Sequence, residues 1–209
     1  MTEEEKILKA VKEIRNTEKK RNFNQTIDLI INLKNFDIRR EAFNTFITVP
    51  FKIKDKKVPG FLEKKSHFIE TITKDDFPRY KEKKDMKKFV NEFDFFIANA
   101  KLMPAVATIF GRVLGPVGKM PSPQLGILIT EDENSIKKLI EKINNTVKIR
   151  VKEPSIKAPV AKESLTDEQI VKNILAVYQK LLETLPKKRE NIKNVLIKLS
   201  MGKPVKVQI

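Results

Sequence analysis

The apolar pattern changes twice along this chain, and these two changes constrain its fold more than any other feature. Near the N-terminus, NFNQTIDLIINL places apolar residues at mostly alternate positions, the period of a β-strand with one buried face. Between residues 57 and about 146, short apolar runs such as FDFFIA and LGILIT alternate with helical segments, as in an open α/β layer. Patterns of the first kind then return. The order predicts an α+β domain built from both ends, with an α/β domain inserted in it.

The distribution of charge supports the same division. The net charge is +16 at pH 7, but residues 57–146 hold 16 basic and 12 acidic side chains, whereas the two flanks together hold 27 and 15. We therefore expect residues 1–57 and 147–209 to form one discontinuous domain and residues 58–146 to form the insertion. A chain this basic attracts polyanions, so we expect a nucleic-acid partner rather than a lysine-rich surface that only aids solubility.

Local signals predict where the two long helices of the flanks begin. Thr2 and Glu5 have the spacing of a capping box and precede an amphipathic segment. Thr166 and Gln169 have the same spacing before DEQIVKNILAVYQKLLETL, and Pro186 should end that helix.

Strands are expected on either side of these helices. TFITVPFKI, residues 45–53, is one candidate, in which Pro50 indicates an edge strand or a bulge. VKIRVKEPSIKAPVAK reads as strand, loop and strand, and NVLIKLSMGKPVKVQI as strand, tight turn and strand.

Several functional classes lack the residues that they need. There is no cysteine, which excludes disulfides and thiolate metal sites, and the single histidine, His67, has no partners for a zinc site. The N-terminus does not resemble a signal peptide, and no apolar run approaches the ~20 residues that span a bilayer. We expect a cytoplasmic protein without metal, cofactor or membrane partner that is monomeric when free.

The stretch GRVLGPVGKMPSP, residues 111–123, raises the possibility of a phosphate-binding loop. Its glycine spacing fits neither the P-loop nor the dinucleotide fingerprint, and Met120 follows Lys119 where a P-loop needs a hydroxyl. We interpret it as a rigid, irregular loop that follows the helix MPAVATIFG. The loop residues that we expect to contact RNA or the other domain are Gly111, Arg112, Gly115, Gly118, Lys119 and Pro121.

Catalytic groupings are equally weak. The common nucleophile–base pairs lack parts, and the carboxylates of Asp75–Asp76 and Glu131–Glu133 stand at expected helix starts, where capping explains them. An enzyme acting on nucleotides or RNA through the inserted domain remains an alternative, although no motif favours it.

The glycine–proline stretch resembles the signature of the ribosomal protein L1 family, the universal protein of the mobile side stalk of the large ribosomal subunit. RNFNQTIDLIINL, IKAPVAK and LSMGKPVKV resemble three further family segments in the right order, so the resemblance covers essentially the whole chain and is nearer to the archaeal branch. It implies a split α+β sandwich domain with an inserted Rossmann-like α/β domain. It also implies a non-enzymatic role: binding of large-subunit rRNA at the tRNA exit site, where the stalk moves with deacylated tRNA, and repression of the protein's own messenger RNA.

The same resemblance implies which residues meet the RNA. Small polar and acidic groups of this kind can reach 2′-hydroxyls and base edges, whereas lysines bind phosphate. Phe23 and Met201 are expected against sugars or bases, although core packing is an alternative for both. The expected RNA-binding residues are Phe23, Thr26, Asp28, Lys157, Lys162, Ser200, Met201, Gly202 and Lys203.

Overall fold

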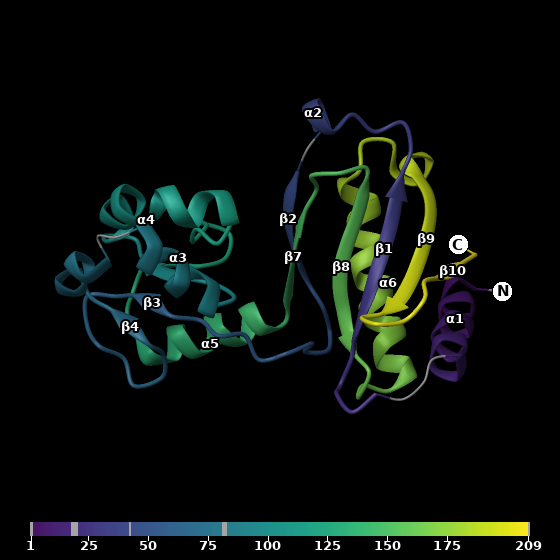
Figure 1. The fold of residues 1–209 in the computed structure, drawn as a ribbon, viewed down its shortest axis with the longest axis horizontal. Helices are drawn as coiled ribbons and strands as arrows, with labels where there is room; N and C mark the ends of the chain where they lie inside the picture. Colours follow the sequence, from purple (N-terminus) through teal and green to yellow (C-terminus); the bar gives the residue numbers. More distant parts are fainter. Residues whose placement is uncertain (1, 18–20, 42, 81–82, 209) are drawn as a thin grey trace. The chain divides into compact units, whose positions relative to one another are not determined.

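The structure, a computed structural model, describes residues 2–17, 21–41, 43–80 and 83–208. The chain separates into two compact units (Figure 1). We call Met1–Lys54 with Asn145–Ile209 the split unit, and Asp55–Asn144 the inserted unit. The fold class expected from the sequence is confirmed, because an antiparallel sheet with helices and a parallel sheet with helices are both present.

The split unit is built on a four-stranded antiparallel sheet in the order β10-β9-β1-β8. The first strand in sequence therefore lies in the middle, between two strands from the C-terminal part of the chain. Its strands are β1 (Thr26–Leu33), β8 (Ser155–Lys162), β9 (Ile192–Leu199) and β10 (Val205–Val207).

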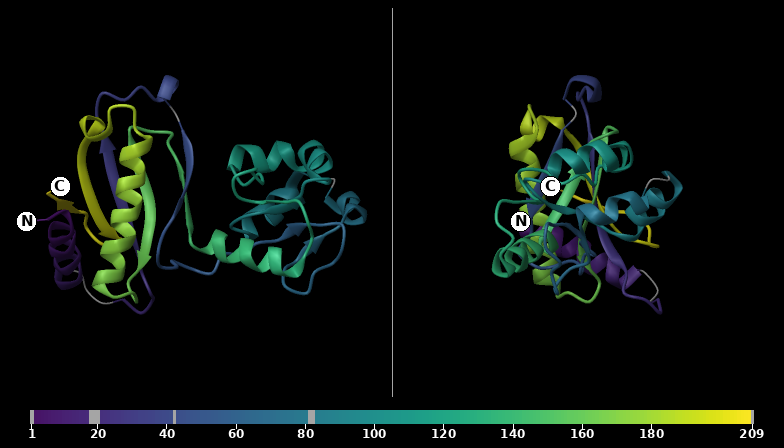
Figure 2. Two further views of the ribbon diagram at one scale, coloured as in Figure 1. Left: turned by 180° about the vertical axis from the view of Figure 1, so that it is seen from behind. Right: turned by 90° about the vertical axis from the view of Figure 1, so that its left-hand side faces the viewer.

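Two helices, α1 (Glu3–Thr17) and α6 (Asp167–Thr184), bury their apolar stripes in the same core as the sheet. Alternate residues of β1 from Ile27 to Leu33 are buried in that core, and those between them are half-buried. Helix α6 runs behind the strands in Figure 1 and in front of them in Figure 2, left, so it covers one face. The other face of the sheet is left for solvent or a ligand.

Both predicted capping boxes are present. The Thr2 backbone N–H donates to Glu5 Oε2 at 3.0 Å, and the Glu5 N–H donates to Thr2 Oγ1 at 3.3 Å. Thr166 and Gln169 make the same reciprocal pair at the start of α6. Each pair satisfies backbone N–H groups that have no partner within the helix.

A separate two-stranded antiparallel sheet joins β2 (Asn44–Thr48) to β7 (Thr146–Arg150). The strand expected over residues 45–53 is wrong at its C-terminal end, because β2 stops two residues before Pro50, which has no backbone N–H to give to a ladder. The remaining short elements of this unit are α2 (Ile38–Glu41) and the 3₁₀ helix η2 (Lys188–Asn191).

The inserted unit holds a parallel sheet in the order β4-β3-β5-β6, with strands of only two or three residues. Phenylalanine rings from the strands and helices fill its core, and the Phe61 and Phe110 ring centroids are 5.0 Å apart. Its elements are β3 (Gly60–Phe61), β4 (Thr71–Ile72), η1 (Lys74–Tyr80), α3 (Lys83–Glu92), β5 (Ile97–Asn99), α4 (Met103–Val117), β6 (Ile127–Leu128) and α5 (Glu133–Asn144).

Candidate nucleic-acid interface

The face of the antiparallel sheet opposite the buried core carries most of the residues expected to meet RNA. We call it the open face. The half-buried positions of β1 lie on it, and strand register brings a polar or cationic neighbour to each of them. From one end to the other, Thr26 pairs with Lys162, Asp28 with Lys198, Ile30 with Lys157 and Leu196, and Asn32 with Ser155 and Asn194.

Thr26 and Lys162 form a fixed pair at one end of the open face. Lys162 Nζ donates to Thr26 Oγ1 at 2.9 Å and to the Asn24 carbonyl at 3.4 Å. An ammonium group only donates, so the Thr26 hydroxyl must act as the acceptor in this pair. Its own hydrogen is therefore available to an acceptor outside the protein.

Ser200 is held by the strand backbone rather than presented as a free hydroxyl. Its Oγ accepts from the Thr26 N–H at 3.2 Å and donates to the Thr26 carbonyl at 3.2 Å. The single hydroxyl hydrogen is thus used within the protein, although we expected Ser200 to offer a donor to RNA. What the structure supports for Ser200 is the positioning of Thr26.

Asp28 lies between two lysines, with its side chain half-buried. Burial raises the pKa of its carboxyl group, and the nearby ammonium groups of Lys198 and Lys162 oppose this shift. Within the described parts of the chain, no group donates a hydrogen bond to this carboxylate. A partly desolvated acceptor without a partner is costly, and a ligand that donates to it would recover that cost.

Phe23 and the turn after β9 lie at the same end of the sheet as Ser200 and Thr26. Phe23 precedes β1 and is 53% exposed, and Met201 is 62% exposed, so neither packs in the core. The Met201 N–H donates to Gln25 Oε1 at 3.4 Å, and the Gly202 N–H donates to the Leu199 carbonyl at 2.9 Å. These contacts fix the turn beside the start of β1 and leave two apolar side chains in the open.

The expected lysines differ in their surroundings. Lys157 is exposed on the open face and pairs with Glu153 at 3.2 Å, so it has to exchange one anion for another to bind phosphate. Lys203 is exposed after the turn. Sequence reasoning missed Lys198, although the alternation of β9 places it on the same face as Ser200 two residues later.

Arg15, which sequence reasoning also missed, supports this end of the sheet from behind. Its guanidinium donates to the carbonyls of Glu163 and Leu165 and pairs with Asp167 at 3.0 Å. The loop that it holds is tied to the segment before β1, since Asn24 Nδ2 donates to Ser164 Oγ at 3.0 Å. No local pattern signals Arg15, because its partners lie about 150 residues away in sequence.

The glycine–proline stretch is not the irregular loop that the sequence predicts. Helix α4 continues to Val117, so Gly111, Arg112 and Gly115 are helical, and the turn begins only at Gly118, whose φ is 74°. The helix persists because Val106, Phe110, Val113 and Leu114 make a buried stripe, and packing outweighs the low helix propensity of glycine. The Gly118 conformation is left-handed, which glycine adopts without strain.

Two other residues of this stretch, Lys119 and Pro121, are held within the inserted unit. Lys119 Nζ donates to the carbonyls of Val90 at 2.8 Å and Phe93 at 2.6 Å, near the C-terminal end of α3. A cation there satisfies carbonyls that have no partner within the helix. Pro121 is buried. Arg112 stays exposed on α4. The stretch therefore does not gather its candidate residues into one site.

Two carboxylates of the inserted unit, those of Glu131 and Asp76, accept hydrogen bonds that stabilise the fold. Glu131 accepts from the backbone N–H groups of Glu63 at 2.7 Å and Lys64 at 3.1 Å and from Asn99 Nδ2 at 2.6 Å. Burial alone would raise the pKa of Glu131, but these hydrogen bonds outweigh it and lower the pKa. Asp76 accepts from Thr73 rather than facing Asp75 as a catalytic pair.

Neither a metal centre nor a membrane segment emerges from the described residues. They contain no group of three or more His, Cys, Asp or Glu side chains that could hold a metal ion. No described helix is both long and apolar enough to cross a bilayer.

Comparison with known proteins gives one consistent result. Residues 11–203 match the model of the Ribosomal protein L1p/L10e family. The chain is 36% identical to "Large ribosomal subunit protein uL1" of Methanocaldococcus jannaschii, over 98% of this chain and 95% of that protein. It is 32% identical to the protein of the same name from Methanothermobacter thermautotrophicus, over 98% and 99%. It is 35% identical to that of Nanoarchaeum equitans, over 90% and 93%.

Proposed function

Because the chain belongs to the ribosomal protein L1p/L10e family, whose members are structural ribosomal proteins rather than enzymes, we propose that its open face binds a folded segment of large-subunit rRNA. The family supports a place in the large ribosomal subunit and leaves no support for the enzymatic alternative. The contact residues are those that the family resemblance implies, together with Lys198, which strand register adds beside Asp28.

The observation that carries this proposal is the pairing of a donor and an acceptor on β1. The Thr26 hydroxyl can donate outward because Lys162 supplies its internal bond, and the Asp28 carboxylate can accept because no described group donates to it. An RNA minor groove offers both complements, since 2′-hydroxyls donate and accept and base edges carry amino groups. A carboxylate that faced RNA only by accident would repel its phosphates.

The remaining residues supply affinity without sequence information. Lys157, Lys198 and Lys203 can bind phosphate, and the exposed Phe23 and Met201 can pack on sugar or base faces. Ser200 and Arg15 position this end of the sheet from within.

Two finer proposals concern partners. The same open face binds a similar structure in the protein's own messenger RNA, so that excess protein represses its own translation. On the ribosome, the rRNA that the protein holds contacts tRNA at the exit site. Both proposals follow from the family resemblance and from one surface serving two RNAs. A competition titration, in which large-subunit rRNA displaces the messenger fragment in proportion to its concentration, tests the first. Simultaneous binding of both RNAs would contradict it.

The main test exchanges Asp28 for asparagine. If Asp28 only faces the RNA, Asp28→Asn removes a repulsive charge and should tighten binding to every RNA. If both Asp28 oxygens accept hydrogen bonds from the RNA, the change keeps one acceptor, puts an NH2 donor in place of the other and removes the charge from both bonds, so it should weaken binding to the rRNA segment by about 1–3 kcal/mol and leave random RNA unchanged or bound slightly more tightly. Filter binding to both RNAs across a salt series measures this difference.

Two control variants distinguish recognition of the RNA from attraction to its phosphates and from a purely structural role. Lys203→Ala should weaken binding to both RNAs alike and lower the salt slope by about one. Ser200→Val removes the two hydroxyl bonds to the Thr26 backbone and keeps the bond from the residue 200 N–H to the Thr26 carbonyl, so its loss of rRNA binding should come with a modestly lower melting temperature of the split unit. Loss of binding with unchanged stability would show that Ser200 contacts the RNA directly.

A deletion tests the domain boundaries. We propose that residues 1–57 and 147–209 fold without the insertion, because the core, the sheet and all open-face residues come from these segments. Replacing residues 60–144 by a short glycine–serine linker should leave a folded protein with specific rRNA binding. A folded variant that has lost this binding would place a required contact in the inserted unit.

A further inference from the structure

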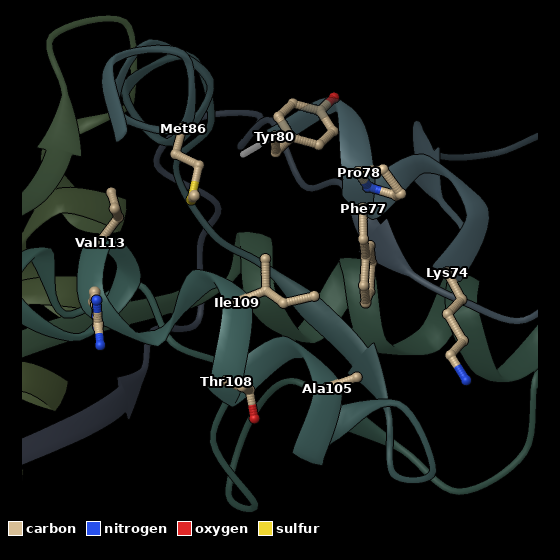
Figure 3. A pocket seen from close by; sticks show the side chains of 10 residues that line it. Lys74, Phe77, Pro78, Tyr80, Met86, Ala105, Thr108, Ile109 and Val113 are labelled. Carbon is tan, nitrogen blue, oxygen red and sulfur yellow. The ribbon is translucent and has the colours of Figure 1, made fainter. Parts of the chain in front are cut away.

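The inserted unit carries a hollow that the open face does not use. It is a cavity of about 640 Å³ between η1, the start of α3 and α4 (Figure 3). We call it the α4 groove. Its walls are apolar and include the side chains of Phe77, Tyr80, Met86 and Ile109, which converge in the close view. This volume is within the range of sites for small ligands.

One wall of the α4 groove is an aromatic ring that the core already holds in place. Tyr80 is half-buried, and its ring centroid lies 4.9 Å from that of Phe89 and 5.7 Å from that of Phe110. Packing from behind fixes the ring before any ligand arrives. The entropic cost of ordering the Tyr80 side chain when a flat ligand stacks on it is therefore small.

The lining of the groove holds two exposed cations, Lys74 and Arg112, and no Asp or Glu among its described residues. The nearest carboxylates are outside the lining, where Glu70, Asp76 and Glu92 act on the Tyr80 hydroxyl. Thr108, also on the rim, donates its hydroxyl hydrogen to the Pro104 carbonyl at 2.9 Å and so can only accept from a ligand. An apolar floor with a cationic rim suits a flat ring that carries an anionic group.

We propose that the α4 groove binds one unstacked nucleotide of single-stranded RNA, with the base against Tyr80 and Ile109 and a phosphate at Arg112. Aromatic walls beside a basic rim are the usual means of holding single strands without reading their sequence. A protein of the large ribosomal subunit is surrounded by this polyanion. The site is separate from the open face and needs neither Thr26 nor Asp28.

Tyrosine fluorescence gives a local readout on the full-length chain. The protein has no tryptophan and two tyrosines, and Tyr178 is 1% exposed in the core of the split unit. Hexauridylate, which cannot form the folded structure that the open face requires, should quench Tyr80 on binding. Asp28→Asn should not alter this quenching, so failure of one proposal is distinguishable from failure of the other.

Paired variants on one helix test the location. Ala105 lines the groove, so Ala105→Leu should fill it and weaken hexauridylate binding at least about fivefold, the low end for loss of one stacked base. Ala107→Leu, on the exposed surface of the same helix and outside the groove, should change nothing. If Ala105→Leu fails to fold, Thr108→Leu at the exposed rim is the second filling variant.

A second pair tests the phosphate contact. Arg112→Ala should lower the salt slope for hexauridylate by about 0.7, whereas Lys138→Ala, an equal charge change on α5, should leave the slope intact. Quenching that is absent, or equal in both leucine variants, would overturn the proposal. Stronger Ala105→Leu-sensitive binding of an acidic, phenylalanine-containing peptide than of hexauridylate would make the groove a protein-docking site and would also overturn it.

Discussion

The two units form their hydrophobic cores from different types of residue. In the split unit the described buried core is aliphatic, with Tyr178 as its one aromatic ring, and it lies under strands of up to eight residues. In the inserted unit six phenylalanines fill the core under strands of two or three residues. Long ladders and helix stripes hold the first unit together, whereas large rings supply buried area in the second.

This difference separates two tasks. A long, regular sheet holds many side chains at set spacings on one open face, which recognition of folded RNA requires. A compact core of rings needs few ladder bonds, and here it leaves a hollow at one edge, beside Tyr80. Changes that damage one core and spare the other would show how far the two units act separately.

The largest effect is expected from opening the aromatic core. Phe110 is fully buried, and its ring centroid lies 5.0 Å from that of Phe61 and 5.4 Å from that of Phe77. Phe110→Ala should cost about 3–5 kcal/mol and unfold the inserted unit first, because a large cavity is left. Calorimetry should then show an early transition, while rRNA binding by the open face survives. Simultaneous unfolding of both units would show that they are one cooperative structure.

The counterpart in the split unit is a buried asparagine. Asn173 is fully buried in α6 and makes three bonds, two with the Phe51 backbone and one to the Val160 carbonyl, at 2.9 Å each. Asn173→Ala leaves these groups unpaired and should cost about 2–4 kcal/mol in the split unit only. Hydrogen exchange should speed up at Phe51, where the chain leaves this core, while the amides of the inserted unit keep their protection.

A smaller, pH-dependent effect is expected at Glu131. Hydrogen bonds lower its pKa in the folded protein, so its contribution is present above the unfolded pKa of about 4.3 and is lost as pH falls through the lower folded pKa. Glu131→Gln should destabilise the inserted unit by about 1–2 kcal/mol at pH 7. The difference in free energy of unfolding between the variant and the unaltered protein should vanish below about pH 4, where Glu131 becomes protonated. Urea unfolding at several pH values measures this difference, and a constant difference would contradict this role.

The smallest effect is expected at a helix start. Thr166→Ala removes one half of the α6 capping box and should cost about 1 kcal/mol, confined to the split unit. Thr108→Ala, which removes an exposed hydroxyl of α4 outside any cap, is the matched threonine control in the inserted unit. A larger loss from the control would mean that α4 depends on this hydroxyl more than its exposure indicates.

Much of the fold follows from local sequence rules. The period of two in TIDLIINL specified which side chains face the core, and both capping boxes were recognisable from Thr, Glu and Gln at fixed spacing. These features depend only on residues a few positions apart. The same reasoning would have found Lys198, because alternation from Ser200 places it on the open face.

The site itself depended on contacts that span the chain. Only the register of β1 with β8 and β9 places Lys162 on Thr26 and locks the Ser200 hydroxyl, and these partners are 136 and 174 residues away from Thr26. Tertiary packing also made a helix of the glycine-rich stretch, since the buried stripe of α4 outweighs what its glycines prefer alone. Periodicity encodes which face of an element is buried. Which hydroxyl remains free to donate, and which lysine caps a distant helix, is settled only when the folded chain brings the partners within 3 Å or so of one another.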